Sequence, residues 1–490
     1  MFWILVQKEL KSIIQSPKFI ASFLTFSILI LLSFYTGIRE YKDFEKNYNT
    51  AKNLIETNIA QADNWMKVNY VAFREPNPMQ IFATGINNDI GRFSSVNRWT
   101  PIKLTQSVYN DDPIFAVFRY IDFTFIVTVV LSLFAILFTY DSINGERENG
   151  TLRLVFSNSI PRNLFILAKF VGTWLGLVIP ILIPILLGIL VIIISGIPIT
   201  GADWIKIAFL LGISLLYFTF FIAVGILVSA LTKHSSTSFL ILLTVWIAFV
   251  FIIPRVGVMV AGQFITVPTN AEIESQRVAY QQQGWKKYSE EFSKLWEKRS
   301  ADMKGMTPAQ QEQYRKDKEF EWMEESDKIT KQREKDENDF YGRIVEGAHN
   351  KREQLEKLAL SLSRFSPASA FQLAVMNLGG TDLEMRQRYE TAMKDFRTKY
   401  NDFVEKKQKE SGGFGGFRIS FSTGSGGSGV KFDDGRGKAI ETKDLPKFTY
   451  PKESLSIALV PSIVDMAIII ILTLGAFAAA YIVFLRYDLR

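Results

Sequence analysis

Side chains that could carry out covalent chemistry are sparse in this chain of 490 residues. There is no Cys and there are only two His, which excludes disulfides, thiolate metal sites, Cys nucleophiles and a His-cluster metal site within one chain. Ser, Asp and Glu are plentiful, but neither G-x-S-x-G nor H-E-x-x-H occurs. The sequence therefore predicts no catalytic residue, no metal site and no cofactor of its own.

Two glycine-containing stretches bear on nucleotide binding. Gly424, Gly426 and Gly429 fit G-x-G-x-x-G, but a dinucleotide loop needs a buried strand before it and a helix after it, and this stretch lies in a Gly/Ser-rich segment that is typical of a linker. The P-loop pattern G-x-x-x-x-G-K-[ST] is absent from the sequence, and Gly437-Lys438 lacks both the upstream Gly and the hydroxyl residue. We expect that this chain does not hydrolyse ATP by itself.

The most concentrated charge lies in the stretch YDSINGERENGTLRL, residues 140–154, between two strongly apolar runs. Asp141, Glu146, Arg147, Glu148 and Arg153 crowd into this short segment. A plain loop between two apolar helices would not need so many charges, which makes this segment the first candidate for a functional site.

The elements that must position this segment are membrane helices. Hydrophobic residues make up 48% of the chain, with 40 Phe, and they gather in long runs. A helix needs about 20 apolar residues to cross the hydrocarbon core. The sequence predicts an all-α membrane protein with six transmembrane helices, at residues 19–38, 120–140, 166–198, 204–232, 235–255 and 455–485.

The distribution of Lys and Arg predicts the orientation of these helices. Basic residues lie before the first helix, between the second and third, between the fourth and fifth, and after the sixth, whereas the short loop after the third has only Asp203 before Lys206. The basic residues are Lys8, Lys11, Lys18, Arg147, Arg153, Arg162, Lys169, Lys233, Arg486 and Arg490. We expect both termini, including the tail 486–490, and the segment 141–165 to be cytoplasmic, with residues 39–119 and 256–454 outside.

The net charge of +7 is explained by these flanking residues rather than by nucleic-acid binding, because no basic-aromatic surface motif occurs. Residues 1–18 alternate apolar and basic side chains at helical spacing, with Pro17 at the end. This pattern predicts a helix that lies on the membrane surface and contacts lipid. No small-residue cleavage site follows, so we do not expect a cleaved signal peptide.

Both outer blocks are expected to be mainly helical. Apolar residues from Tyr41 to Ala62 recur at three- and four-residue steps, which predicts that the first membrane helix continues outward. Thr307 with Gln310 and Thr381 with Glu384 resemble capping boxes, and Ser366-Pro367 resembles another helix start. A long helical hairpin with further helices is predicted, followed by a Gly/Ser-rich loop, 411–437, with a short strand at FRISFS.

Further candidate residues lie within or beside the membrane helices. Arg255, Asp465 and Asp122 fall near the outer ends of three helices, where they would either lie at the level of the lipid headgroups or, for Arg255 and Asp465, form an ion pair at an outer gate. Gly172 and Gly176 form G-x-x-x-G, which allows close helix packing within the chain or between two copies.

Residues 131–177 resemble the core of the type-2 ABC exporter permeases. The shared pattern is Glu146 and Glu148, Gly150-Thr151-Leu152, Ser157-Asn158 with Arg162, and Lys169 with Gly172. The turn SIPR departs mildly from the Pro-x-Ser-Arg often found in the family. The stretches REPNPMQIFATGINNDIGR and LSRFSPASAFQLAVMNLGGT resemble the branch with large outer domains, which is related to the nitrous-oxide-reductase maturation permease.

The resemblance implies a permease subunit of the bacterial inner membrane that pairs with a second copy or a paralogue. A separate ABC ATPase subunit would bind ATP and Mg and would dock on the coupling segment, with Asp141, Glu146, Arg147, Glu148, Gly150 and Thr151 as candidate coupling residues. An alternative is a subunit that transmits ATP-driven motion to an extracytoplasmic partner protein without moving a substrate. The sequence does not indicate the substrate.

Overall fold

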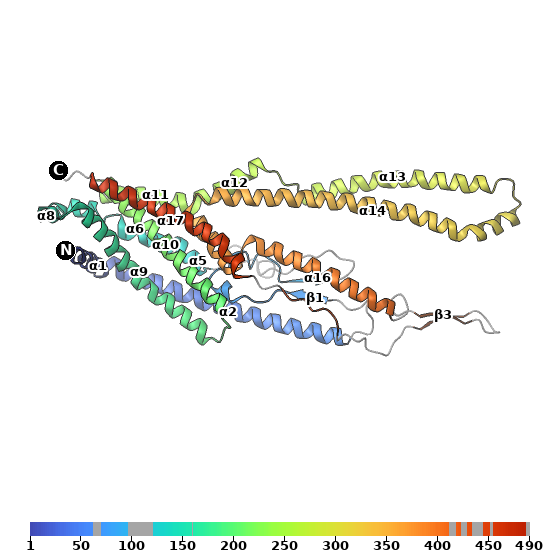
Figure 1. The fold of residues 1–490 in the computed structure, drawn as a ribbon, viewed down its shortest axis with the longest axis horizontal. Coiled ribbons are helices and arrows are strands. Elements are labelled where there is room, and N and C mark those ends of the chain that lie inside the picture. The colour runs from blue at the N-terminus through green and yellow to red at the C-terminus, as the bar shows by residue number, and fades with distance from the viewer. Residues whose placement is uncertain are drawn as a thin grey trace. The chain divides into compact units, whose positions relative to one another are not determined.

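The computed structural model describes residues 1–61, 70–96, 121–158, 160–410, 418–422, 429–433, 444–450 and 454–486. The predicted all-α membrane class is confirmed, because within these described ranges six helical runs are long and apolar enough to span a membrane. They are Pro17–Ala60, Phe123–Glu148, Arg162–Ile194, Gly201–Leu231, Ser235–Phe264 and Leu455–Leu485. The chain forms two compact units, one of Met1–Ile252 with Arg364–Arg490 and one of Ile253–Ser363 (Figure 1).

The N-terminal region forms two helices that are separated by a short break. Helix α1 spans Phe2–Ile14, and α2 spans Pro17–Ala60. The Ser16 hydroxyl caps α2 by accepting a hydrogen bond from the Phe19 N–H at 3.2 Å, and Pro17 occupies the first turn, where its missing N–H costs nothing. The predicted break at Pro17 is confirmed, as is the helical continuation beyond residue 38.

The second and fifth membrane runs each contain a π-helical stretch. The second comprises α5 (Phe123–Phe125), η2 (Ile126–Leu131), α6 (Ser132–Thr139) and α7 (Asn144–Glu148), and the fifth comprises α11 (Ser235–Ile247), η3 (Ala248–Ile252) and α12 (Ile253–Phe264). The Tyr217 hydroxyl donates to the Thr128 carbonyl at 2.9 Å, and Trp246 Nε1 donates to Ser132 Oγ at 2.8 Å. These bonds join the fourth and fifth membrane runs to the second, in or beside its π-helical stretch, where the regular pattern of helical hydrogen bonds is interrupted.

Helix α10 (Gly201–Leu231) lies at the centre of the membrane bundle and packs against α17 (Leu455–Leu485) and the buried helix α15 (Pro367–Gly379). Tyr217 and Phe371 are both fully buried, and their rings stack with centroids 4.8 Å apart. Gly225 of α10 lies so close to Thr139 that a Cβ would overlap the Thr139 side chain. Helix α9 (Arg162–Ile194) runs without interruption through Pro180 and Pro184.

A second core cluster of the first unit joins two strands to α2 and a later helix. Strands β1 (Tyr70–Phe73) and β2 (Phe93–Val96) pair antiparallel, with Tyr70 opposite Val96 and Phe73 opposite Phe93. The 3-10 turn η1 (Pro78–Ile81) follows β1, and β1 lies between α2 and α16 (Leu383–Glu410) in Figure 1. The cluster contains Ile59 of α2, Ala72 and Val96 of the strands, Leu445, and Tyr389, Met393, Phe396 and Tyr400 of α16.

Two details of this region refine the sequence-based predictions. The cap of α16 is Asp382, whose Oδ1 accepts from the Met385 N–H at 2.9 Å, so the predicted capping residue Thr381 is wrong by one position. Burial lowers the pKa of Arg74 to about 10, and its guanidinium donates to the Asn87 carbonyl at 2.8 Å. Arg74 therefore anchors the turn between the strands.

Strands β3 (Arg418–Ser422) and β4 (Gly429–Asp433) pair antiparallel, which confirms the strand predicted at FRISFS. Gly429 begins a strand rather than the helix that a dinucleotide loop requires. Gly424, Gly426, Gly437-Lys438 and Arg490 lie outside the described residues, as do residues 97–119 of the first outer block.

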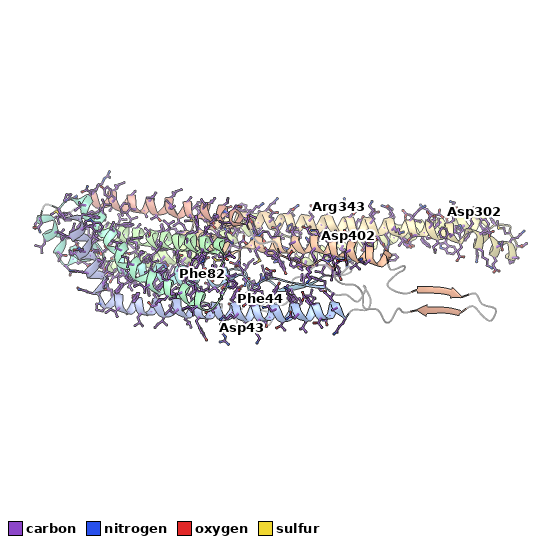
Figure 2. The ribbon with its side chains drawn as sticks, turned by 60° about the horizontal axis from the view of Figure 1, so that its bottom comes forward. Asp43, Phe44, Phe82, Asp302, Arg343 and Asp402 are labelled. Atoms are coloured by element: carbon purple, nitrogen blue, oxygen red, sulfur yellow. The ribbon has the colours of Figure 1, made fainter. Side chains whose placement is uncertain are left out.

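The second unit is the predicted helical hairpin, in which α13 (Asn270–Asp302) pairs with α14 (Pro308–Ser363). Thr269 and Glu272 form a reciprocal capping box at the start of α13. The Gln310 side chain accepts from the Thr307 N–H at 2.9 Å, as predicted. Asp302 marks the tip of the hairpin (Figure 2).

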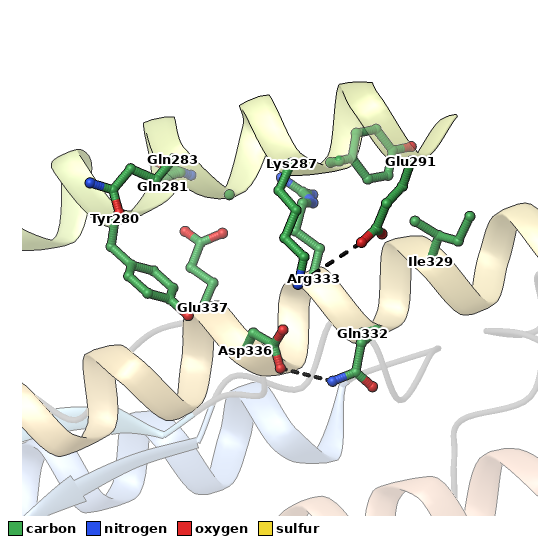
Figure 3. A pocket seen from close by; sticks show the side chains of 12 residues that line it. Tyr280, Gln281, Gln283, Lys287, Glu291, Ile329, Gln332, Arg333, Asp336 and Glu337 are labelled. Carbon is green, nitrogen blue, oxygen red and sulfur yellow. Dashed lines mark hydrogen bonds and ion pairs between the residues drawn. The ribbon is translucent and has the colours of Figure 1, made fainter. Parts of the chain in front are cut away.

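A hollow of about 230 Å³ lies between the two hairpin helices beside Gly284. Figure 3 shows Lys287, Glu291 and Arg333 in this hollow, and the Arg333 guanidinium lies 4.3 Å from the centre of the Trp285 ring. Gly284 has no side chain to fill this space, and long charged side chains line it. The hollow is therefore a gap in helix packing.

Candidate functional site

The charged segment folds into two short helices at one end of the membrane bundle. Helix α7 ends at Glu148, Gly150 adopts a left-handed conformation with φ of 72°, and α8 (Thr151–Ser157) runs back toward α9. Glycine reaches this conformation at little cost because it has no Cβ. Residues 141–157, which we call the coupling tip, are held by hydrogen bonds and ion pairs with the surrounding helices of the bundle.

A buried ion network joins the coupling tip to the N-terminal helix and the third membrane helix. Lys169 Nζ lies 3.0 Å from Glu146 Oε1 and 2.7 Å from Glu9 Oε2, and Lys8 Nζ lies 3.3 Å from the same Glu146 oxygen. The side chains of Lys169, Glu9 and Glu146 are only 7%, 12% and 16% exposed. The network contains two acidic and two basic groups, so its net charge is zero. This balance offsets the desolvation cost of the buried charges.

A second set of bonds joins the coupling tip to the turn between the fourth and fifth membrane helices. Asn144 Nδ2 donates to Thr232 Oγ1 at 3.0 Å, and Ser229 Oγ accepts from the Ile143 N–H at 2.9 Å. Glu148 accepts from both the N–H and the hydroxyl of Ser235, at 3.0 and 2.6 Å. Ser235 is the first residue of α11, so Glu148 places a negative charge at a helix N-terminus, where the helix dipole favours it.

A third attachment reaches the start of the first membrane helix. Lys18 Nζ lies 3.0 Å from Asp141 Oδ2 and donates to the Tyr140 hydroxyl at 2.9 Å. The coupling tip is thus bonded to α1, α2, α9, α10 and α11.

The exposed part of the coupling tip is small and lies around the left-handed turn. Glu148, Asn149, Gly150, Thr151 and Arg153 are exposed. Leu154 is also 67% exposed, which is unusual for a leucine outside the apolar membrane runs. The structure therefore separates the predicted coupling residues: Asp141 and Glu146 bond to neighbouring elements of the same chain, whereas Gly150 and Thr151 lie at the surface.

Helix α1 and the end of α17 lie on the same side of the bundle as the coupling tip. Lys8 of α1 contacts Glu146, and Arg162 donates to the Leu485 carbonyl at the end of α17 at 2.7 Å. As predicted, residues 1–18 and the end of the sixth membrane helix lie on the same side of the bundle as the segment 141–165.

The G-x-x-x-G pair packs within the chain. A Cβ on Gly172 would lie 2.7 Å from Glu9 Cβ, and one on Gly176 would lie 3.4 Å from Ile13. The two glycines thus allow α1 to approach α9 closely enough for Lys169 to reach Glu9. Of the two interpretations of this motif, the contact within the chain is the one that the structure contains.

Two of the charged residues predicted near the ends of membrane helices form bonds within the chain. Asp465, which is fully buried, forms an ion pair with Arg364, with Nε to Oδ1 at 2.6 Å, whereas one of the two interpretations of the sequence paired it with Arg255. Asp122 caps α5 by accepting from the Phe125 N–H at 2.8 Å, and it also accepts from the Thr84 N–H at 3.1 Å. The pairing of Asp465 is therefore corrected to Arg364, which precedes the buried helix α15.

Sequence reasoning missed several residues of the site. Glu9, Asn144, Ser229 and Ser235 are ordinary polar residues in the sequence, and no spacing connects them. One signal was present, because Lys169 interrupts an apolar run, and a cation in such a place needs a counter-ion nearby. Among the described residues, no group of His, Asp and Glu could hold a metal ion.

Two comparisons with known proteins agree with this geometry. The model of the ABC-2 family transporter proteins matches residues 3–489. A protein of Stutzerimonas stutzeri described as "Probable ABC transporter permease protein NosY" is 31% identical over 129 residues, which is 26% of this chain and 46% of that protein. This chain thus spans about half the length of the curated relative that it matches. Because the family model covers nearly the whole sequence, the chain belongs to the ABC-2 family of transporter proteins.

Proposed function

We propose that this chain is the permease subunit of an ATP-driven ABC exporter, coupled to a separate ATPase through the coupling tip. ATP and Mg would bind on that ATPase. The observation that supports this proposal is the attachment of the coupling tip to α1, α2, α9, α10 and α11 while its left-handed turn stays exposed. A segment that is exposed at its end and fixed at its base can pass a displacement to the helices behind it.

The contacts of the coupling tip suggest how force would travel. Closure of the ATPase dimer would press on the exposed residues around Gly150. Because Glu146 is bonded to Lys169 and Glu148 caps α11, the push would reach the third and fifth membrane runs together. The bond between Asp141 and Lys18 would carry it to the first run. Tilting of these runs would open a path beside them, with no covalent chemistry on this chain.

The proposal divides the predicted coupling residues by role. Arg147, Glu148, Gly150 and Thr151 lie on or beside the proposed docking surface, with Leu154 as an added apolar contact. Glu146 and Asp141 would act as positioning residues that hold the coupling tip. A second permease copy or a paralogue would complete the membrane part.

The proposed location is the bacterial inner membrane, with the coupling tip and both termini in the cytoplasm. The supporting observations are the excess of Lys and Arg on the side of the coupling tip and the shared position of α1 and the end of α17. The outer helices and strands would then lie outside the cell membrane.

Cysteine cross-linking tests both the docking surface and the orientation, because the natural sequence has no Cys. Single variants Thr151→Cys and Leu154→Cys should cross-link to a co-expressed ATPase that carries a Cys in its docking cleft. The control is Asn53→Cys, on the exposed outer part of α2. It should be labelled by a membrane-impermeant maleimide added from outside and should not cross-link to the ATPase. Cross-linking at position 53, or external labelling at position 151, would overturn the proposed orientation.

The large hairpin favours a second candidate function, in which ATP-driven motion acts on an extracytoplasmic partner protein and no substrate crosses. Helix α14 alone is 56 residues long, and the membrane run Ser235–Phe264 leads directly into the hairpin unit. Tyr280 and Phe340 stack with ring centres 3.8 Å apart, so the hairpin can be shortened there by replacing residues 281–339 with a short glycine linker. A complex that still moves its substrate after this change is an exporter, whereas complete loss of function with ATPase activity retained supports transmission of motion.

A further inference from the structure

In the part of the chain that the structure describes, the outer edge of β1 in the strand ribbon is not paired with another strand. Arg74 N donates to the Arg92 carbonyl at 3.0 Å, and Phe73 is opposite Phe93 in the register. Hydrogen-bonded and non-hydrogen-bonded pairs alternate along an antiparallel ladder. Ala72 and Tyr70 therefore bond to β2, whereas the N–H and C=O groups of Val71 and Phe73 point to the other edge. Among the described residues, no third strand pairs with that edge.

A cavity of about 380 Å³ runs along this edge. Tyr70, Val71 and Phe73 of β1 all line it. Successive side chains of a strand point to opposite faces, so a cavity that is lined by residues of both faces must lie at the edge between them. The unpaired main-chain groups of Val71 and Phe73 are thus directed into this cavity.

The opposite wall is one face of α2. Tyr48, Lys52, Ile55, Glu56 and Ile59 line the cavity, and their spacing of four, three, one and three residues keeps them on one side of the helix. Leu445, Lys447, Phe448 and Thr449 also line the cavity, and the Phe448 N–H donates to the Tyr70 hydroxyl at 2.7 Å. We call this space, between β1 and α2, the edge groove.

We propose that the edge groove binds an extended polypeptide segment of a partner protein, which adds to β1 as a third strand. Outward N–H and C=O groups at strand spacing are complementary to another strand, and a two-stranded ribbon gains stability from such an addition. The four residues of β1 span about 13 Å, so a segment of about four residues would pair along it.

The charges of the groove indicate what the bound segment should carry. Lys447 Nζ lies 3.2 Å from Glu56, and Glu75 accepts from the Tyr48 hydroxyl at 3.5 Å. Lys52, by contrast, has no ion pair within the part of the chain that the structure describes, and its side chain lines the groove. The bound segment should therefore combine alternating apolar residues with one acidic residue that lies near Lys52. This inference holds whether the chain exports a substrate or transmits motion.

Binding can be tested on the full-length chain in lipid nanodiscs with a synthetic probe. The probe is a fluorescent octapeptide of alternating Val and Thr with one central Asp, and its control is the same peptide with every backbone amide methylated. Methylation removes the N–H donors of both edges and leaves the side chains unchanged. We expect the unmethylated peptide to bind at least tenfold more tightly. Equal affinity of the two peptides, or no binding of either, would overturn the proposal.

Variants of the chain locate the binding to the groove. Val71→Pro removes an N–H that the β1–β2 ladder does not use, and proline is tolerated on such an edge; it should weaken binding at least tenfold. Lys52→Glu should reverse the preference of the groove toward a peptide with Lys in place of Asp, whereas Lys46→Glu, on an exposed part of α2 outside the groove, should not. If Val71→Pro does not fold, the comparison of Lys52→Glu with Lys46→Glu still decides, because equal effects of the two reversals would place the peptide elsewhere.

Discussion

Lys169 Nζ of the third membrane helix lies 2.7 Å from Glu9 Oε2 of the N-terminal helix, and both side chains are nearly buried. The same ammonium group also bonds to Glu146 of the coupling tip. One cation thus fixes the position of two helices against a third, and we expect its removal to affect both.

Lys169→Met should destabilise the chain by about 3–5 kcal/mol, because Glu9 and Glu146 would remain buried without their main counter-ion. The triple variant Lys169→Met, Glu9→Gln and Glu146→Gln removes the charges together and should recover part of that loss. Thermal unfolding in detergent, followed by tryptophan fluorescence, measures both. If the triple variant is less stable than Lys169→Met alone, the network does not act as a balanced ion cluster.

The ion pair between Arg364 and Asp465 should show an asymmetry between its partners. Arg364→Leu leaves a fully buried carboxylate without its cation, whereas Asp465→Asn leaves an arginine that is 28% exposed and can reach water. We therefore expect Arg364→Leu to lower the unfolding temperature more than Asp465→Asn. The double exchange Arg364→Asp with Asp465→Arg should restore part of the lost stability. If thermal unfolding shows that the double variant loses as much stability as the two single variants together, the two side chains do not act as an ion pair.

Two glycines of the same membrane helix should respond in opposite ways to a methyl group. A Cβ on Gly225 would lie 1.8 Å from Thr139 Oγ1, whereas none of the surrounding atoms lies within 4 Å of a Cβ on Gly212. Gly225→Ala should cost about 1–3 kcal/mol or prevent folding, because α10 and α6 must move apart. Gly212→Ala should be neutral or stabilise by up to about 1 kcal/mol through helix propensity. The yield of monodisperse protein and its thermal midpoint test the difference.

Two glycines of the hairpin offer a second contrast. Gly284 lies within α13 beside the hollow, with no neighbour within 4 Å of a Cβ, whereas Gly305 has a φ of 92° in the turn. Gly284→Ala should stabilise α13 by about 0.8–1 kcal/mol, and Gly305→Ala should destabilise the turn by about 1 kcal/mol or more. Hydrogen exchange of the full-length chain should slow in α13 for the first variant and quicken at the turn for the second. If exchange in α13 became faster in Gly284→Ala, the added methyl group would have destabilised the helix, and the prediction would be wrong.

Much of the fold follows from patterns within short stretches of sequence. Runs of about 20 apolar residues predicted the six membrane helices, since backbone groups in a membrane must be satisfied within the helix. Helix starts at Pro308 and Pro367 were visible because the capping residue and the proline are neighbours in the chain, and Pro17 marked the end of the N-terminal helix. The place of the charged segment between two apolar runs marked it as a candidate site.

The tertiary structure alone decided which charges pair. Glu146 bonds to Lys169 and Lys8, and Asp465 bonds to Arg364, which is 101 residues away in the chain. Spacing along the sequence carries no information on such pairs, because they depend on how helices from distant segments pack. The same holds for the unpaired edge of β1, whose register with β2 determines that Val71 and Phe73 face outward. The sequence by itself determined which segments cross the membrane and where the charges gather; packing decided which of those charges hold the structure together and which stay exposed.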